Sequence, residues 1–217
     1  MSVRRASLLA LWAFALAFGC VEAATVVYLR ATVAQPVGHE LFPLIVLSPQ
    51  LLAIEIVREG CTLFMLAAVA CAAGRHWRDR IGAFLLTFGL WDLAYYAALH
   101  VMIGWPDGIS NWDILFLIPA PWVAPVWAPT IIAIIFTAAG TYVFWTAGQQ
   151  HDYAVSDAVV LLAASAAVVL ACLLESDAVI TLTQPESFPM WLYWAGVLAG
   201  LGSFLHAELR QTQRRHA

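Results

Sequence analysis

The sequence predicts an all-α fold, a polytopic transmembrane helix bundle with six spans, and two observations support this prediction. The first is composition: of 217 residues, 63% are hydrophobic and only 11% are charged, and the mean hydropathy is +0.83. A soluble domain carries about 25% charged residues. The second is the clustering of apolar residues into long runs, which reach the ~20 residues that a helix needs to cross a bilayer.

The six expected spans form a single integral membrane domain over residues 1–217. They cover about 7–29, 49–73, 81–104, 124–146, 154–175 and 191–208. The first run follows Arg4 and Arg5, as in a signal peptide, but it continues to Leu29, which is too long for the apolar part of a signal peptide. We therefore expect it to remain as a signal-anchor helix.

The second span has the clearest helix boundaries. Ser48 suits an N-cap, and Pro49 suits the first turn of a helix. Gly74 suits the position just past the last turn. Residues 49–73 are therefore expected to form one continuous helix.

Arginine is distributed unevenly among the connections between spans. The three clusters are Arg4 and Arg5 before the first span, Arg75, Arg78 and Arg80 after the second, and Arg210, Arg214 and Arg215 after the sixth. The opposite connections hold one arginine, Arg30, beside Glu40, Asp107, Asp113, Asp177 and Glu186. Because positive loops stay in the cytoplasm, we expect a bacterial-type inner (plasma) membrane protein with both termini cytoplasmic.

The segment 105–129, between the third and fourth spans, is rich in Trp and Pro. Its apolar part, 114–118, is too short to span, and four prolines follow within 119–129. One interpretation is an interfacial helix that leads into a kinked fourth span, with Asp113 in water. The other is a re-entrant lid that carries Asp113 inward, since irregular backbone at membrane depth must be covered by protein or line a water-filled cavity.

Polar residues form a stripe on the second span. Glu55, Arg58, Glu59 and Thr62 follow at i, i+3, i+4 and i+7, so they lie on one helix face. An ionisable group at membrane depth costs at least about 2.5 kcal/mol. Such a stripe therefore predicts a buried polar site with a partner, a proton or a metal ion.

The first and third spans carry polar residues at a similar depth. Glu22 lies in the outer half of the first span, and Asp92, Tyr96 and His100 follow at i, i+4 and i+8 on the third. Gly19 and Gly89 predict close approach of these helices. The fourth to sixth spans contain mostly small and aliphatic residues and are expected to be scaffold.

Each polar residue also has a structural interpretation. Glu55 and Arg58 fit an intrahelical ion pair, Glu22 a protonated interhelical hydrogen bond, Asp92 a network with tyrosines, and His100 simple solvation. The four carboxyl groups within the spans still face a single arginine. That excess of negative charge predicts bound protons or cations.

The sequence thus leads to three hypotheses for function. The first is a membrane metalloenzyme that acts on a lipid-like or quinone-like substrate. Its metal would be Mn, Fe or Zn, with ligands from Glu22, Glu55, Glu59, Asp92 and His100, and with Glu59, Asp92, Arg58 and Tyr96 as catalytic groups. The others are a proton- or cation-coupled transporter, and a non-catalytic subunit that binds membrane partner subunits. No phosphate-loop, hydrolase or nucleic-acid-binding motif occurs in the sequence.

Overall fold

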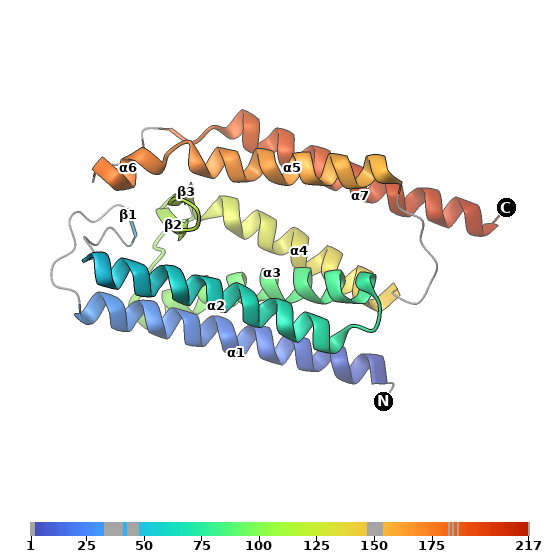
Figure 1. Cartoon of the computed structure of the whole chain (residues 1–217), viewed down its shortest axis with the longest axis horizontal. Helices are drawn as coiled ribbons and strands as arrows, with labels where there is room; N and C mark the ends of the chain where they lie inside the picture. The colour runs from blue at the N-terminus through green and yellow to red at the C-terminus, as the bar shows by residue number, and fades with distance from the viewer. Residues whose placement is uncertain are drawn as a thin grey trace.

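Six long helices run along the length of the molecule (Figure 1). The computed structural model describes residues 3–32, 41–42, 48–146, 154–181, 183, 185 and 187–216. The helices are α1 (Val3–Thr32), α2 (Pro49–Ala73), α3 (Trp77–Ile103), α4 (Trp127–Thr146), α5 (Val155–Leu173), the short α6 (Ser176–Thr181) and α7 (Met190–His216). Glu40 and Glu186, which the sequence places in connections, lie outside the described residues.

Five helical segments in the described part of the chain are long and apolar enough to cross a membrane. They are Val3–Ala31, Pro49–Ala73, Trp77–Ile103, Trp127–Thr146 and Val155–Val179. These segments coincide with the first five predicted spans, so the membrane and multi-pass predictions are supported. The sixth predicted span, 191–208, lies within α7, which is not one of the five.

The helix boundaries follow from local hydrogen bonds. The Ser48 hydroxyl accepts the Leu51 N–H at 3.3 Å, and α2 covers the predicted range 49–73. Helix α3 begins at Trp77, earlier than the predicted 81, because the Asp79 carboxylate accepts the backbone N–H groups of Arg75 and His76 at 3.1 and 3.3 Å. Such bonds satisfy donors that a helix start leaves unpaired.

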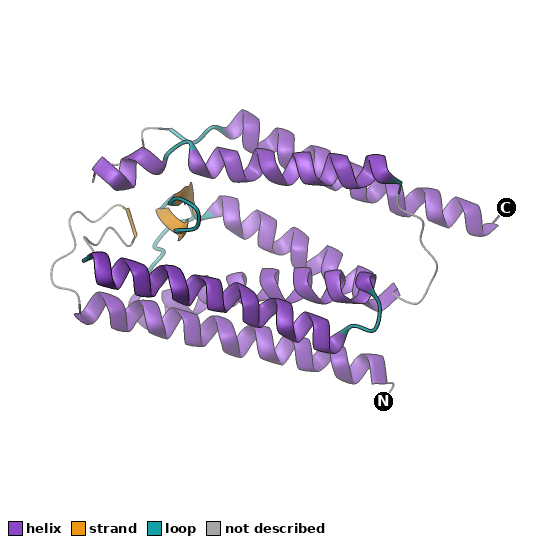
Figure 2. Ribbon diagram, viewed as in Figure 1, coloured by secondary structure: helices purple, strands orange, loops and turns teal. Residues whose placement is uncertain are grey.

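The Trp/Pro-rich segment forms a small sheet, coloured orange in Figure 2. Strand β2 (Trp112–Phe116) pairs antiparallel with β3 (Trp122–Pro125) and parallel with β1 (Leu41–Phe42). The interfacial helix expected over 114–118 is therefore wrong. Branched and aromatic side chains favour an extended strand here, and the prolines that follow prevent a helix.

Helix α3 is the centre of one group of helices, because α1, α2 and α4 all pack against it. A Cβ on Gly19 would lie 2.5 Å from the Trp91 carbonyl oxygen, which confirms the predicted close approach of α1 and α3. Gly89 allows a close approach too, but to α4, since its Cβ would lie 2.8 Å from the Thr137 nitrogen. Helices α5 and α7 form a separate pair (Figure 1).

The glycine at the α3–α4 crossing gives a first testable prediction. A Cβ on Gly140 would lie 2.7 Å from the Gly82 carbonyl oxygen, and backbone atoms cannot move aside easily. We expect Gly140→Ala to lower the free energy of unfolding by about 1–3 kcal/mol. Gly60→Ala is the matched control, because no atom lies within 4 Å of the position that its Cβ would take, and its stability should be unchanged or higher. Thermal unfolding in detergent measures both.

The helix pair α5–α7 is attached to the other group at two ends. At the hairpin end, the end that holds β2 and β3, the Tyr193 hydroxyl donates to the Ala128 carbonyl at 2.8 Å. At the arginine end, where both termini lie (Figure 1), Arg78 donates to Glu208 at 3.0 Å. Tyr142 donates to the other oxygen of Glu208 at 3.2 Å. These contacts fix the pair across the space between the two groups.

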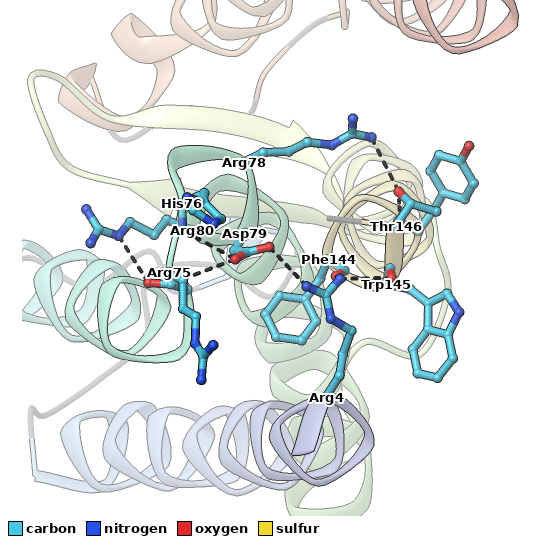
Figure 3. Close-up of polar contacts among 11 residues, drawn as sticks. Arg4, Arg75, His76, Arg78, Asp79, Arg80, Phe144, Trp145 and Thr146 are labelled. Atoms are coloured by element: carbon cyan, nitrogen blue, oxygen red, sulfur yellow. Dashed lines mark hydrogen bonds and ion pairs between the residues drawn. The ribbon is translucent and has the colours of Figure 1, made fainter. Parts of the chain in front are cut away.

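The arginine end is tied together by side chains that reach from one helix to another (Figure 3). Arg4 on α1 donates to the carbonyl oxygens of Phe144 and Trp145 at 2.7 and 2.9 Å, at the end of α4. Arg4 also lies 3.6 Å from the Asp79 carboxylate. A cation at these carbonyls is favourable because the C-terminal end of a helix carries partial negative charge.

Candidate functional site

A large cavity lies between the two groups of helices. Its volume is about 1140 Å³, and its lining includes residues from all six long helices and from β2 and β3. Drug-sized ligands occupy pockets of about 300–1000 Å³. The cavity is therefore large enough for a lipid-sized molecule.

Apart from Arg78, whose guanidinium pairs with Glu208, the part of the cavity toward the arginine end is largely apolar. Its walls there are aromatic and aliphatic side chains of α3, α4, α5 and α7: Phe84, Leu85, Phe136, Ala139, Val143, Leu161, Leu162, Leu201 and Phe204. The prediction that the last three spans are only scaffold is incomplete, because α4, α5 and α7 supply much of this wall. Such a surface favours an acyl or isoprenoid chain over a polar ligand.

One polar group in the cavity wall joins α1 and α2. Arg58 bridges two carboxylates: one of its terminal nitrogens pairs with Glu22, and its Nε lies 2.8 Å from Glu55. Thr62 also donates to Glu22 at 3.1 Å. The predicted intrahelical pair of Glu55 and Arg58 is present, and Glu22 extends it across to α1. All four residues line the cavity.

A second polar group joins α3 and β2. The Tyr96 hydroxyl donates to Asp113 at 2.7 Å, and Asp113 is only 1% exposed. The interpretation that Asp113 faces water is therefore wrong; the strand carries it inward. Burial raises the pKa of Asp113 to about 8; the hydrogen bond from Tyr96 opposes this shift, and the nearby Asp92 carboxyl adds to it.

Glu59 contacts the hairpin. Its carboxylate accepts the backbone N–H of Leu117 at 2.8 Å, just after β2. Glu59 therefore holds the hairpin against α2 and lines the cavity at the same point. The predicted stripe on α2 is thus divided between the α1 contact and the hairpin contact.

His100 lies apart from the other predicted site residues. It is exposed, its ring Nδ1 lies 2.8 Å from the Pro106 carbonyl oxygen, and it does not line the cavity. Within the described ranges, no three His, Cys, Asp or Glu side chains are grouped so as to hold a metal ion. The predicted metal centre of Glu22, Glu55, Glu59, Asp92 and His100 is therefore not supported, because arginine, threonine and backbone groups already occupy the glutamates.

Three buried polar atoms near the hairpin end have no hydrogen-bond partner in the described part of the chain. They are Oδ1 of Asp113 and the indole Nε1 atoms of Trp91 and Trp122. All three residues line the cavity. An unpaired buried donor or acceptor costs about 1–3 kcal/mol, so a ligand that pairs with it is stabilised. This end of the cavity can therefore hold a polar head group.

The structure brings six of the predicted site residues to one cavity and adds residues that the sequence does not assign to the site. Glu22, Glu55, Arg58, Glu59, Asp92 and Tyr96 all line it. Asp113 is the main addition. The signal that points to it is an aspartate between Trp112 and an apolar run, because a charged residue in such a run needs a buried partner.

Comparison with family models, curated proteins and solved structures gave no match.

Proposed function

We propose that this protein binds an amphipathic, lipid-like or quinone-like molecule in the cavity, with its tail along α4, α5 and α7 and its polar head near the hairpin. The observation that carries this proposal is the division of a single cavity of about 1140 Å³ into an apolar part and a polar part. A head group at one end and a chain at the other match that division.

Asp113 is the group best suited to act on the head. Its pKa of about 8 lies near neutral pH, where a carboxyl group exchanges protons most effectively as a general acid or base. The Tyr96 hydroxyl holds one carboxyl oxygen, and the other oxygen has no partner among the described residues. We propose an acid–base enzyme, with Asp113 transferring a proton at the head group and Tyr96 positioning it.

A blocked cavity tests the binding proposal. Ala139 lines the cavity on α4, whereas its neighbour Ala138 is exposed on the outside of the same helix. We expect Ala139→Trp to fill the apolar part and to reduce the co-purifying amphipathic molecule at least tenfold, while Ala138→Trp leaves it unchanged. Mass spectrometry of an organic extract measures the molecule and distinguishes a phospholipid from a quinone. Equal amounts in both variants would contradict the proposal.

The arrangement in the membrane is also part of this proposal. We place α7 as a sixth span, the hairpin as a lid over the outer end, and the arginine end in the cytoplasm of a bacterial-type inner membrane. The support is the concentration of Arg at the end where both termini lie (Figure 1). Single cysteines at exposed positions of each end, labelled from outside with a membrane-impermeant maleimide, would test the orientation.

The other two hypotheses stay predictions. For ion transport, the cavity offers few polar side chains toward the arginine end, and a proton or cation crossing there would lack ligands. A role as a subunit of a larger complex is less favoured, because the described residues of this chain build the cavity by themselves.

A further inference from the structure

The hairpin half of the cavity is lined by more acidic than basic side chains. The acidic residues are Glu22, Glu55, Glu59, Asp92 and Asp113, and the basic ones are Arg30 and Arg58. Buried negative charge in excess of its partners is unfavourable unless a proton or a cation accompanies it. The polar half is therefore better matched to a positive head group than to a negative one.

The arginines do not favour an anionic head group. Arg58 is engaged by Glu22 and Glu55, so a phosphate would have to compete with two carboxylates for its guanidinium. Arg30 lies within electrostatic range of the Asp113 carboxyl group. A phosphate would therefore compete with carboxyl groups for both arginines that line this half of the cavity.

Asp92 offers an acceptor directly in the cavity wall. It is half-buried, lines the cavity, and forms no hydrogen bond or ion pair with any residue that the structure describes. One turn further along α3, Tyr96 donates to Asp113, whose second carboxyl oxygen is buried without a partner among those residues. Two carboxyl groups with unused acceptor capacity thus lie close enough to interact electrostatically.

Aromatic rings line the same cavity as these two carboxyl groups. Trp91 and Tyr95 stack with centroids 6.4 Å apart, and Tyr95 meets Tyr96 edge-on at 5.2 Å. On the hairpin side, the ring centroids of Phe116 and Trp122 lie 5.5 Å apart. Ring faces attract ammonium groups, and a carboxylate can add a charge-assisted hydrogen bond to them.

We infer that the cavity takes an amphipathic amine, a lipid-like molecule whose ammonium head is held by Asp92 and Asp113 among these rings. The inference rests on the proposed function and makes its ligand class specific. In an aminophospholipid, the indole N–H groups of Trp91 and Trp122, unpaired among the described residues, would also donate to the ester or phosphate oxygens beside the ammonium group. Two sources share the ammonium head on an apolar chain: an aminophospholipid and a simple long-chain amine.

Native mass spectrometry of the full chain in detergent tests the inference with three probes. They are phosphatidylethanolamine, phosphatidylglycerol with the same acyl chains, and a long-chain primary amine. We expect at least one of the two amines to bind about tenfold more tightly than phosphatidylglycerol, a difference of about 1.4 kcal/mol. Whichever amine binds identifies the source. Equal or tighter binding of phosphatidylglycerol would overturn the inference.

Substitutions connect the preference to the named residues. Asp92→Asn should remove most of the tenfold preference, whereas Asp92→Glu, which keeps the charge, should retain it. Asp107→Asn, in an exposed turn of the connection, should leave it unchanged. Should Asp92→Asn fail to fold, Asp113→Asn provides the second test.

The outcomes separate this inference from the proposed function. Loss of all lipid binding in Ala139→Trp together with an unchanged preference in Asp92→Asn would contradict the inference while leaving the proposed function standing. Failure of every probe to bind the wild type would overturn the inference, whereas the proposed function is overturned only by equal amounts of co-purifying molecule in Ala139→Trp and Ala138→Trp.

Discussion

Replacing Arg58 by methionine is expected to destabilise the protein by about 3–5 kcal/mol, because it leaves two buried carboxylates without their cation. Glu22 and Glu55 are 8% and 10% exposed at their side chains, so water screens them little. Arg58 contacts them through different nitrogens, and one guanidinium therefore links α1 to α2. Unfolding in detergent micelles titrated with a denaturing detergent measures the loss.

Two further variants separate the charge effect from packing. The triple variant Glu22→Gln, Glu55→Gln, Arg58→Met removes all three charges and should recover most of the lost stability, since neutral side chains of similar volume often replace buried ion pairs without penalty. Arg58→Lys should recover only part, because an ammonium group cannot pair with both carboxylates in the same geometry. Arg75→Met, at an exposed position, is the control and should change little. A loss below about 1 kcal/mol for Arg58→Met would show that this group is solvated.

The positions of the helices could largely be predicted from the sequence. Apolar runs at the length of a bilayer indicated five of the observed helices within a few residues, and Ser48 and Gly74 marked both ends of α2. Helical periodicity also placed Glu55 and Arg58 in contact, because residues three apart lie on one face. These features are local, so the chain itself specifies them.

The cavity and the hairpin could not be predicted in the same way. The contact between Glu59 and Leu117 joins residues far apart in the chain, and no local pattern indicates where that carboxylate points. Likewise, the position of Asp113 depends on how β2 pairs with β1 and β3. The space between α4 and the α5–α7 pair arises from tertiary packing, which composition and periodicity do not determine.

The metal prediction shows the limit of a charge count. Four carboxyl groups against one arginine indicated a cation, but two of them share Arg58 and a third accepts a backbone N–H. His100, placed on the same face of α3 by spacing alone, lies beyond the cavity at the exposed end of the helix. A drift of the i, i+4, i+8 positions around the helix is enough to separate His100 from Asp92.

Stability should fall as pH rises, and Asp113 should account for a large part of that fall. Its pKa rises from 3.8 in an ordinary setting to about 8 in the folded protein, mainly because of burial. Between these values the unfolded chain loses the proton while the folded chain keeps it. The free energy of unfolding therefore falls by about 1.4 kcal/mol per pH unit, in total on the order of 5 kcal/mol between about pH 4 and pH 8.

Asp113→Asn isolates this contribution because its amide oxygen still accepts the Tyr96 hydroxyl but does not titrate. Near pH 4 we expect the variant and the wild type to have similar free energies of unfolding. The variant should become the more stable of the two as pH rises to about 8, and above that pH the difference in free energy should stay constant. Tyr96→Phe removes a hydrogen bond that favours the charged form, so the fall in stability should extend to higher pH. Asp107→Asn, in an exposed turn, should follow the wild type throughout. Parallel pH profiles of the unfolding free energy for Asp113→Asn and the wild type would mean that Asp113 is ionised and paired in the folded state. Its pKa would then not be raised, and the acid–base role proposed for it would be contradicted.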